Sequence, residues 1–225
     1  MEALKAKKFN VVPLILSVTD HDGLGKVELE QLLFRDVRTR GELQELLSQE
    51  FGDAGNRALS HYWPPDAVEA KAVHQSLSRL SNDLWYYAGT HYMGQLLADS
   101  MPVFCCSFGG LKRSVHGSDA MYWRGLPKGN LPLHMSRYLA NFARTGDPNG
   151  AGLPMWEAGY LRRLHLGASV EMQALNEEQR CWYNFLGEEY FSKAILRKVG
   201  ALDPCALSEP DATCGSNKRP CVGAE

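Results

Sequence analysis

Two short apolar runs constrain the fold of this chain more than any other feature of its sequence. Residues 11–19, VVPLILSVT, are followed by the polar DHDG, and residues 103–108, VFCCSF, are followed by GG. A continuous apolar run of this length is typical of a strand that is buried on both faces, as in a parallel sheet covered by helices. Between the two runs, helical spacing of leucines and tyrosines extends over 27–51, with an interruption near Gly41, and from a cap at Asp66 to about Ser100. This order predicts an α/β fold.

The remainder of the chain adds two helices and two further strands to this expectation. The pattern predicts a helix from about Leu131 to Arg144, β-like runs at LRRLHL and VEMQAL, and an amphipathic helix over 177–199. The segment 200–225 is rich in Pro, Gly, Ser and Cys and lacks core-forming periodicity. We therefore expect residues 1–199 to belong to one folded unit and residues 200–225 to form a flexible tail.

Composition and charge exclude several classes of function. The 225 residues are 44% hydrophobic and 22% charged, and the formal net charge is −2. Nothing in that balance marks a protein that binds nucleic acid or a membrane surface. We find neither an apolar run of about 18 residues, as a membrane span needs, nor the apolar core of a signal peptide near the N-terminus.

The six cysteines fall into three groups. Cys105 and Cys106 lie inside the second apolar run, where they are expected to be small buried hydrophobic residues. Cys181 lies in a helical pattern. The tail cysteines lack the paired C-x₂₋₄-C spacing of a zinc site, so disulfides or free thiols are the favoured alternatives; they are Cys205, Cys214 and Cys221.

A histidine–glycine pair follows the second predicted strand, in SVHGSDAMY at residues 114–122. In open α/β sheets, ligands bind at the carboxyl ends of the strands. Because Asp22 follows the first strand and His116 follows the second, both are expected at the same edge of one sheet. A carboxylate that orients a histidine can make it a catalytic base. We interpret the neighbouring Asp20 and His21 as solvated turn residues.

Three segments together resemble the C-terminal portion of the type B carboxylesterase family: KFNVVPLILSVTDHDG, VHGSDAMY and MSRYLANFARTGDPNGAGLPMWEAGY. The resemblance implies an α/β-hydrolase fold and a serine–acid–histidine triad that cleaves carboxylic esters. It places the catalytic histidine at His116 and the acid at Asp22, where the family most often has glutamate. It also implies that Ser118 and Asp119 shape the histidine loop, and that the central sheet of this chain is incomplete. Ser17 stands where the family commonly has glycine.

The nucleophile of such a triad is missing from these 225 residues. No serine satisfies the G-x-S-x-G pattern of a nucleophile elbow, and no glycine-rich oxyanion loop precedes the acid. In the family both elements lie upstream of the matched region. We therefore expect this chain alone to be inactive, and to act on an ester substrate only when it is joined to an N-terminal part. No cofactor and no metal are implied.

Two other interpretations remain open at this stage. The chain is also compatible with a non-catalytic binding or adhesion protein of the same family, or with a structural subunit that completes a hydrolase sheet with a separately encoded half. In either case the exposed sheet edge is a candidate surface for association. Members of the family are commonly secreted or located in the secretory pathway, and the sequence leaves the compartment of this chain open.

Overall fold

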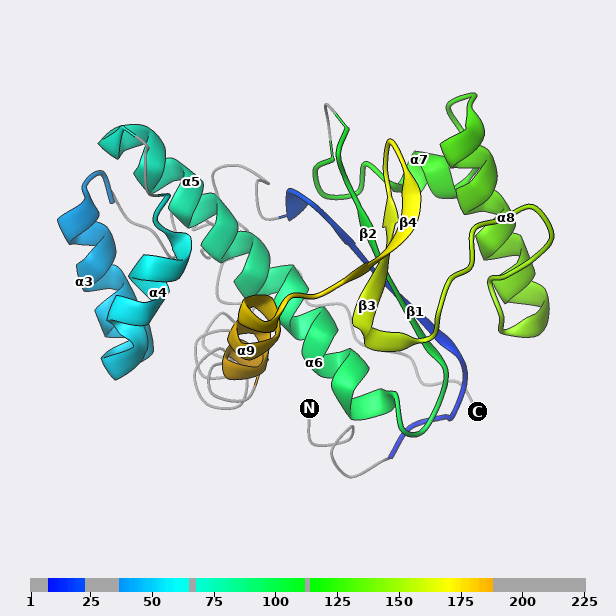
Figure 1. Ribbon diagram of the computed structural model, residues 1–225, viewed down its shortest axis with the longest axis horizontal. Coiled ribbons are helices and arrows are strands. Elements are labelled where there is room, and N and C mark those ends of the chain that lie inside the picture. The colour runs from blue at the N-terminus through cyan, green and yellow to red at the C-terminus, as the bar shows by residue number, and fades with distance from the viewer. Residues whose placement is uncertain (1–7, 23–36, 65–67, 112–113, 188–225) are drawn as a thin grey trace, which may run out of the picture.

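The computed structural model describes residues 8–22, 37–64, 68–111 and 114–187, and places a four-stranded sheet between two helical layers (Figure 1). The strands are β1 (Leu14–Thr19), β2 (Val103–Phe108), β3 (Gly159–Leu166) and β4 (Val170–Ala174). They lie in the order β1-β2-β3-β4; β1 and β3 run parallel to β2, and β4 is antiparallel to β3. The predicted α/β class and all four predicted strand segments are confirmed.

Strand β2 is the centre of this sheet, and all six of its residues are buried. Its side chains alternate between two cores, because successive residues of a strand point to opposite faces. Phe104, Cys106 and Phe108 enter the core on one face, whereas Val103 and Cys105 enter the core on the other. Burial raises the pKa of Cys105 to about 11 and that of Cys106 to about 12, so both thiols stay protonated and behave as the small apolar residues that were expected.

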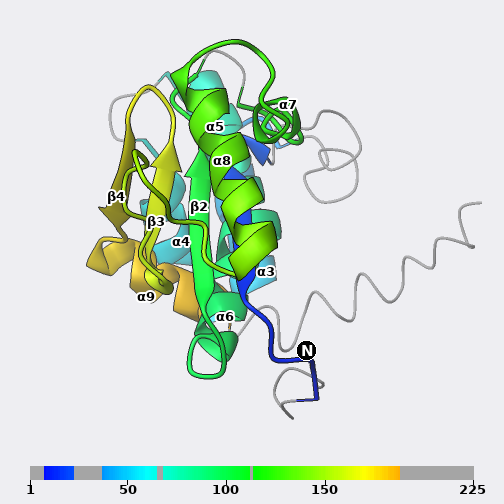
Figure 2. The ribbon, with the colours of Figure 1, turned by 90° about the vertical axis from the view of Figure 1, so that its right-hand side faces the viewer.

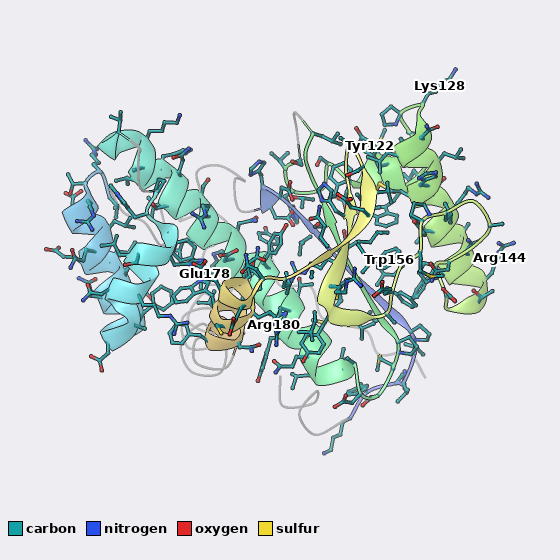
Figure 3. The ribbon with its side chains drawn as sticks, viewed as in Figure 1. Tyr122, Lys128, Arg144, Trp156, Glu178 and Arg180 are labelled. Atoms are coloured by element: carbon teal, nitrogen blue, oxygen red, sulfur yellow. The ribbon has the colours of Figure 1, made fainter. Side chains whose placement is uncertain are left out.

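Helices α7 (Ala120–Trp123) and α8 (Asn130–Thr145) cover one face of the sheet (Figure 2). α8 contributes the fully buried Met135 and Tyr138 to this core. Trp156 fills the space between α8 and the strands (Figure 3), and its indole N–H donates to the carbonyl oxygen of Cys105 at 3.0 Å. The predicted helix at 131–144 is thereby confirmed, one residue longer at each end.

The opposite face is covered by α6 (Ala88–Leu97), the last part of a long helical segment in which α5 (Glu69–Asn82) and η3 (Asp83–Tyr87) come before it. η3 is a turn of π-helix, a widened turn that is frequent at functional sites. The expected cap at Asp66 lies outside the described residues, and Val68, which precedes α5, makes no side-chain capping bond. The helical prediction from this region to about Ser100 is otherwise confirmed.

A second helical cluster packs against this long segment. It contains α3 (Arg40–Phe51), η2 (Gly52–Ala54), α4 (Gly55–Tyr62) and α9 (Glu177–Phe185). Helices α3 and α4 contact α5, and α9 contacts α6. The described part of the predicted helix at 27–51 begins at Arg40, after the reciprocal cap formed by Thr39 and Glu42. The aromatic centre of this cluster is Tyr62 with Trp182, whose indole N–H donates to the Tyr62 hydroxyl at 2.6 Å.

Some sequence predictions fall on residues that are not described. Residues 23–36, the predicted helix beyond residue 187, and the tail at 200–225 with its three cysteines lie outside the described residues. Within the described ranges, no helix has the length and apolar character needed to span a bilayer.

Candidate functional site

Asp22 lies just beyond the carboxyl end of β1, in a turn that buries its side chain. The carboxylate is only 6% exposed. The backbone N–H of Thr19 donates to Oδ2 of Asp22 at 2.6 Å, which closes the turn and leaves Oδ1 to face another partner. A buried carboxylate requires hydrogen bonds that offset its lost hydration. This local bond is therefore one reason why an aspartate fits at this position.

The loop that carries His116 continues the parallel pairing of β1 with β2 beyond the two strands. The backbone N–H of His21 donates to the carbonyl oxygen of Ser114 at 3.0 Å, and His21 forms an isolated parallel bridge with Val115. Gly117 then turns the chain with a φ of 74°, in the left-handed region that favours glycine. His116 is thus held beside the Asp22 turn by backbone geometry.

Asp22 and His116 meet across this junction. Nδ1 of His116 lies 3.0 Å from Oδ1 of Asp22. Because the carboxylate only accepts hydrogen bonds, Nδ1 carries the proton, and Nε2 of the neutral ring is left with a lone pair. The His116 side chain is 67% exposed, and Nε2 has no hydrogen-bond partner among the described residues. The arrangement can therefore accept a proton at Nε2 and stabilise the resulting imidazolium through Asp22.

A tyrosine of the π-helical turn covers part of the imidazole. The ring centroids of Tyr86 and His116 are 5.4 Å apart, with an interplanar angle of 41°. Burial, and secondarily the nearby charge of Asp22, raises the pKa of the Tyr86 hydroxyl, so it remains neutral at physiological pH.

The side chain of Asp119 links the loop that carries His116 to strand β1. Its Oδ2 accepts from the indole N–H of Trp123 at 3.0 Å and from the hydroxyl of Ser17 at 3.4 Å. The Ser118 hydroxyl is buried without a partner among the described residues, and Ser118 instead donates its backbone N–H to Val115 at 2.9 Å. Both residues thus take part in the loop, Asp119 through its side chain and Ser118 through its backbone.

Asp20 is not the solvated turn residue that we expected, and this interpretation was wrong. Oδ2 of Asp20 accepts from the backbone N–H of Gly110 at 2.9 Å, and Oδ1 accepts from the hydroxyl of Tyr87 at 3.4 Å. Its carbonyl oxygen accepts from the Asn82 side chain at 3.0 Å. Asp20 therefore joins the end of β1 to the end of β2 and to the long helical segment. Its neighbour His21 is exposed, as expected.

In the part of the chain that the structure describes, no hydrogen bond joins a serine hydroxyl to His116. Nor do the described side chains include a group of three or more histidines, cysteines or carboxylates arranged to hold a metal ion. The chemistry that these residues support is proton transfer by an oriented imidazole.

A cavity of about 690 Å³ lies beside the site, between the end of β1 and helices α4, α5 and α9. Most of the residues that line it are of polar type, and the charged or titratable members include Asp20, His61, His74, Arg79 and Asp83. Neither Asp22 nor His116 lines it, so this cavity is not the space in front of Nε2.

Sequence reasoning identified the acid–histidine pair but missed the residues that support it. The contacts of Asp20 depend on residues 62 to 90 positions away in the sequence, and no local pattern announces them. Tyr86 lies in the run DLWYY, within the segment from Asp66 to about Ser100 whose spacing predicts a helix. No signal in this run distinguishes Tyr86 from its neighbours, because adjacent aromatic residues of a helix can enter the same core, as Trp182 and Tyr183 do.

Comparison with known proteins shows which protein family the sequence around this site matches. A model of the family described as "Carboxylesterase family" matches residues 1–182, which include both Asp22 and His116. Carboxylesterase 3 of Homo sapiens is 23% identical over 228 aligned positions, covering 85% of this chain and 40% of the human protein.

Shorter stretches are more similar. Carboxylesterase 5A of Felis catus is 49% identical over 59 residues, covering 24% of this chain and 11% of the cat protein. The liver carboxylesterase of Sus scrofa is 33% identical over 92 residues, covering 35% and 16% of the two chains. The chain spans less than half the length of these relatives.

Proposed function

Because this chain belongs to the carboxylesterase family, we propose that it supplies the acid and the general base of a serine esterase, Asp22 and His116. The observation that carries the proposal is the 3.0 Å contact between Nδ1 of His116 and the buried Asp22 carboxylate. In a serine hydrolase this contact fixes the ring so that Nε2 faces the nucleophile.

The proposed reaction is acyl transfer from a carboxylic ester to a serine and then to water. Nε2 of His116 takes the proton of the serine hydroxyl as its oxygen attacks the ester carbonyl, and returns that proton to the departing alcohol. The same nitrogen then takes a proton from water as the water oxygen attacks the acyl-serine, and gives that proton to the serine oxygen as the carboxylic acid leaves. Asp22 stabilises the imidazolium in both halves of the cycle.

The serine and the oxyanion hole of this proposal lie in a part of the enzyme that these 225 residues do not contain. Without them, the largest electrostatic contribution to catalysis and the covalent step are both absent. The chain by itself is therefore expected to hydrolyse esters no faster than buffer.

The unpaired edge of strand β1 is a candidate surface for binding the part of the enzyme that carries the serine. Among the described strands β1 has a neighbour on one side only, and the exposed Val11 and Val12 precede it. An unpaired strand edge with apolar side chains favours pairing with a further strand. We propose that a strand of the serine-bearing part adds here, which would bring the nucleophile to the carboxyl end of β1.

The test is a chimera in which this chain follows the N-terminal part of a carboxylesterase relative that carries its serine elbow. The chimera is expected to hydrolyse a nitrophenyl butyrate ester, and a serine-directed organophosphate should abolish the activity. His116→Ala should lower kcat by about 10⁵-fold or more, as loss of a triad histidine does elsewhere.

His61→Ala is the matched control, because His61 also contacts carboxylates but bonds to neither Asp22 nor His116. It should leave kcat within about threefold of the parent chimera. A folded chimera that is active without His116, or one that labels with the organophosphate yet depends equally on His61, would contradict the proposal.

A further inference from the structure

His116 has two contacts that involve its ring, and the two constrain different motions. The bond from Nδ1 to Asp22 fixes the direction in which that nitrogen points. A single hydrogen bond leaves the imidazole free to swing about the axis of the bond. The ring of Tyr86, tilted by 41° with its centroid 5.4 Å from that of His116, restricts this remaining rotation.

The π-helical turn explains how Tyr86 comes to lie there. η3 is anchored at both ends to the turn that carries the acid: the Asn82 side chain donates to the carbonyl oxygen of Asp20, and the Tyr87 hydroxyl donates to its carboxylate. Tyr87 is also held by the guanidinium of Arg163, which lies 4.7 Å from its ring centroid. With both flanks fixed in this way, Tyr86 has little freedom to move away from His116.

The contact involves the ring of Tyr86 and not its hydroxyl. No hydrogen bond joins the Tyr86 hydroxyl to Asp22 or His116 in the described structure. The raised pKa of this hydroxyl, caused by burial and then by Asp22, means that it adds no negative charge beside the imidazole at neutral pH. A phenylalanine would preserve the face that touches His116.

We propose that Tyr86 is a positioning residue, which holds the plane of the His116 ring so that Nδ1 stays on Asp22 and Nε2 stays aimed at the missing nucleophile. This inference rests on the proposed function, since only a catalytic imidazole needs a fixed Nε2. It extends that function by assigning a third side chain, on the long helical segment, to the acid–histidine pair.

The test measures the tautomer of His116 in the full chain by long-range ¹H–¹⁵N NMR at alkaline pH, where histidine side chains are neutral. The wild-type chain and Tyr86→Phe should both show His116 with the proton on Nδ1. Tyr86→Leu removes the aromatic face, and the ratio of the Nδ1–H form to the Nε2–H form should fall about tenfold.

The buried His91 is the internal control for folding, because it bonds to Asn184 at 2.9 Å and contacts neither Asp22 nor Tyr86. Its signals should be the same in all variants. If Tyr86→Leu alters the His91 signals, Tyr86→Met serves in its place, since an unbranched side chain suits the helix and still lacks an aromatic face.

The outcomes separate the two proposals. A wild-type spectrum with Nδ1–H, left unchanged by Tyr86→Leu or Tyr86→Met, would overturn the role of Tyr86 and leave the acid–histidine pair standing. An equal loss in Tyr86→Phe would overturn the role of the ring face in favour of the hydroxyl. A wild-type spectrum with Nε2–H would overturn the pair itself, and the role of Tyr86 with it.

Discussion

Two histidines of the described residues contact carboxylates, and the burial of these two histidines is opposite. At the sheet edge, His116 is 67% exposed and its partner Asp22 is 6% exposed, with 3.0 Å between Nδ1 and Oδ1. In the helical cluster, His61 is 11% exposed and its partner Glu178 is 72% exposed, with 2.8 Å between Nδ1 and Oε1. Nε2 of His61 also lies 3.9 Å from Oδ2 of Asp83, in addition to the shorter contact of Nδ1 with Glu178. Distance alone does not distinguish these two pairs.

Burial of the partners does distinguish them. A general base needs an accessible nitrogen and a fixed acceptor behind it, which a buried carboxylate supplies. His61 instead stacks on Trp182 with ring centroids 5.0 Å apart, and its carboxylate partner reaches in from the surface of α9 (Figure 3). We interpret this second pair as a contact that joins α4 to α9.

The largest effect expected in this comparison is on catalysis at the sheet edge. In the chimera with a serine-bearing part, Asp22→Asn should lower kcat by about 10⁴-fold, because an amide can hold the imidazole in the wrong tautomer. KM should change little, since the bond is far from the bound ester. Steady-state hydrolysis of a nitrophenyl ester measures both constants.

Glu178→Gln in the same chimera is the control for that variant. It alters the other carboxylate to the corresponding amide and should leave kcat unchanged. A loss of less than about tenfold in Asp22→Asn would show that Asp22 does not act as the acid of a triad.

A smaller effect is expected on stability in the helical cluster. His61→Ala removes a mostly buried ring that packs edge-on against Tyr62, at 4.8 Å between centroids, as well as on Trp182. The free energy of unfolding should fall by about 1–3 kcal/mol. Urea denaturation followed by tryptophan fluorescence gives this value, and His116→Ala, which loses a mainly exposed side chain, should lower it by less than half as much.

The smallest effect is expected for the exposed carboxylate of the second pair. Glu178→Gln keeps an oxygen that accepts from the His61 ring, and the ion pair of an exposed glutamate contributes little because solvent screens it. Denaturation should report a change of less than about 1 kcal/mol. A larger loss of free energy of unfolding would show that the contact between His61 and Glu178 stabilises the position of α9 more than the exposure of Glu178 predicts.

The order of the elements could be predicted because each strand and helix has its own local signal in the sequence. The acid and the histidine could be predicted because each follows soon after one of the two predicted strands. β2 is buried on both faces, so VFCCSF is apolar throughout, and parallel pairing with β1 places the loops after the two strands at one edge of the sheet. His116 stands out because glycine and small polar residues come directly after it. The resemblance to carboxylesterases, which the family match confirms, assigned its role.

The supporting contacts could not be predicted, since each depends on the exact approach of distant segments. Asp20 was expected to be solvated because it lies in a polar turn. Its carboxylate instead occupies the space that a side chain at position 109 would need, which glycine leaves empty, and it accepts from the N–H of Gly110. The π-helical turn is likewise invisible in the sequence, because DLWYY has the composition of an ordinary helix.

The most direct test of the acid–base assignment is the tautomer of His116 in the wild-type chain and in Asp22→Asn, read from the long-range ¹H–¹⁵N spectrum. We predict that neutral His116 carries its proton on Nδ1 in the wild-type chain, and that Asp22→Asn moves the proton to Nε2. A wild-type spectrum that already shows the proton on Nε2, and does not respond to Asp22→Asn, would contradict the claim that these two residues form the acid and base of an esterase.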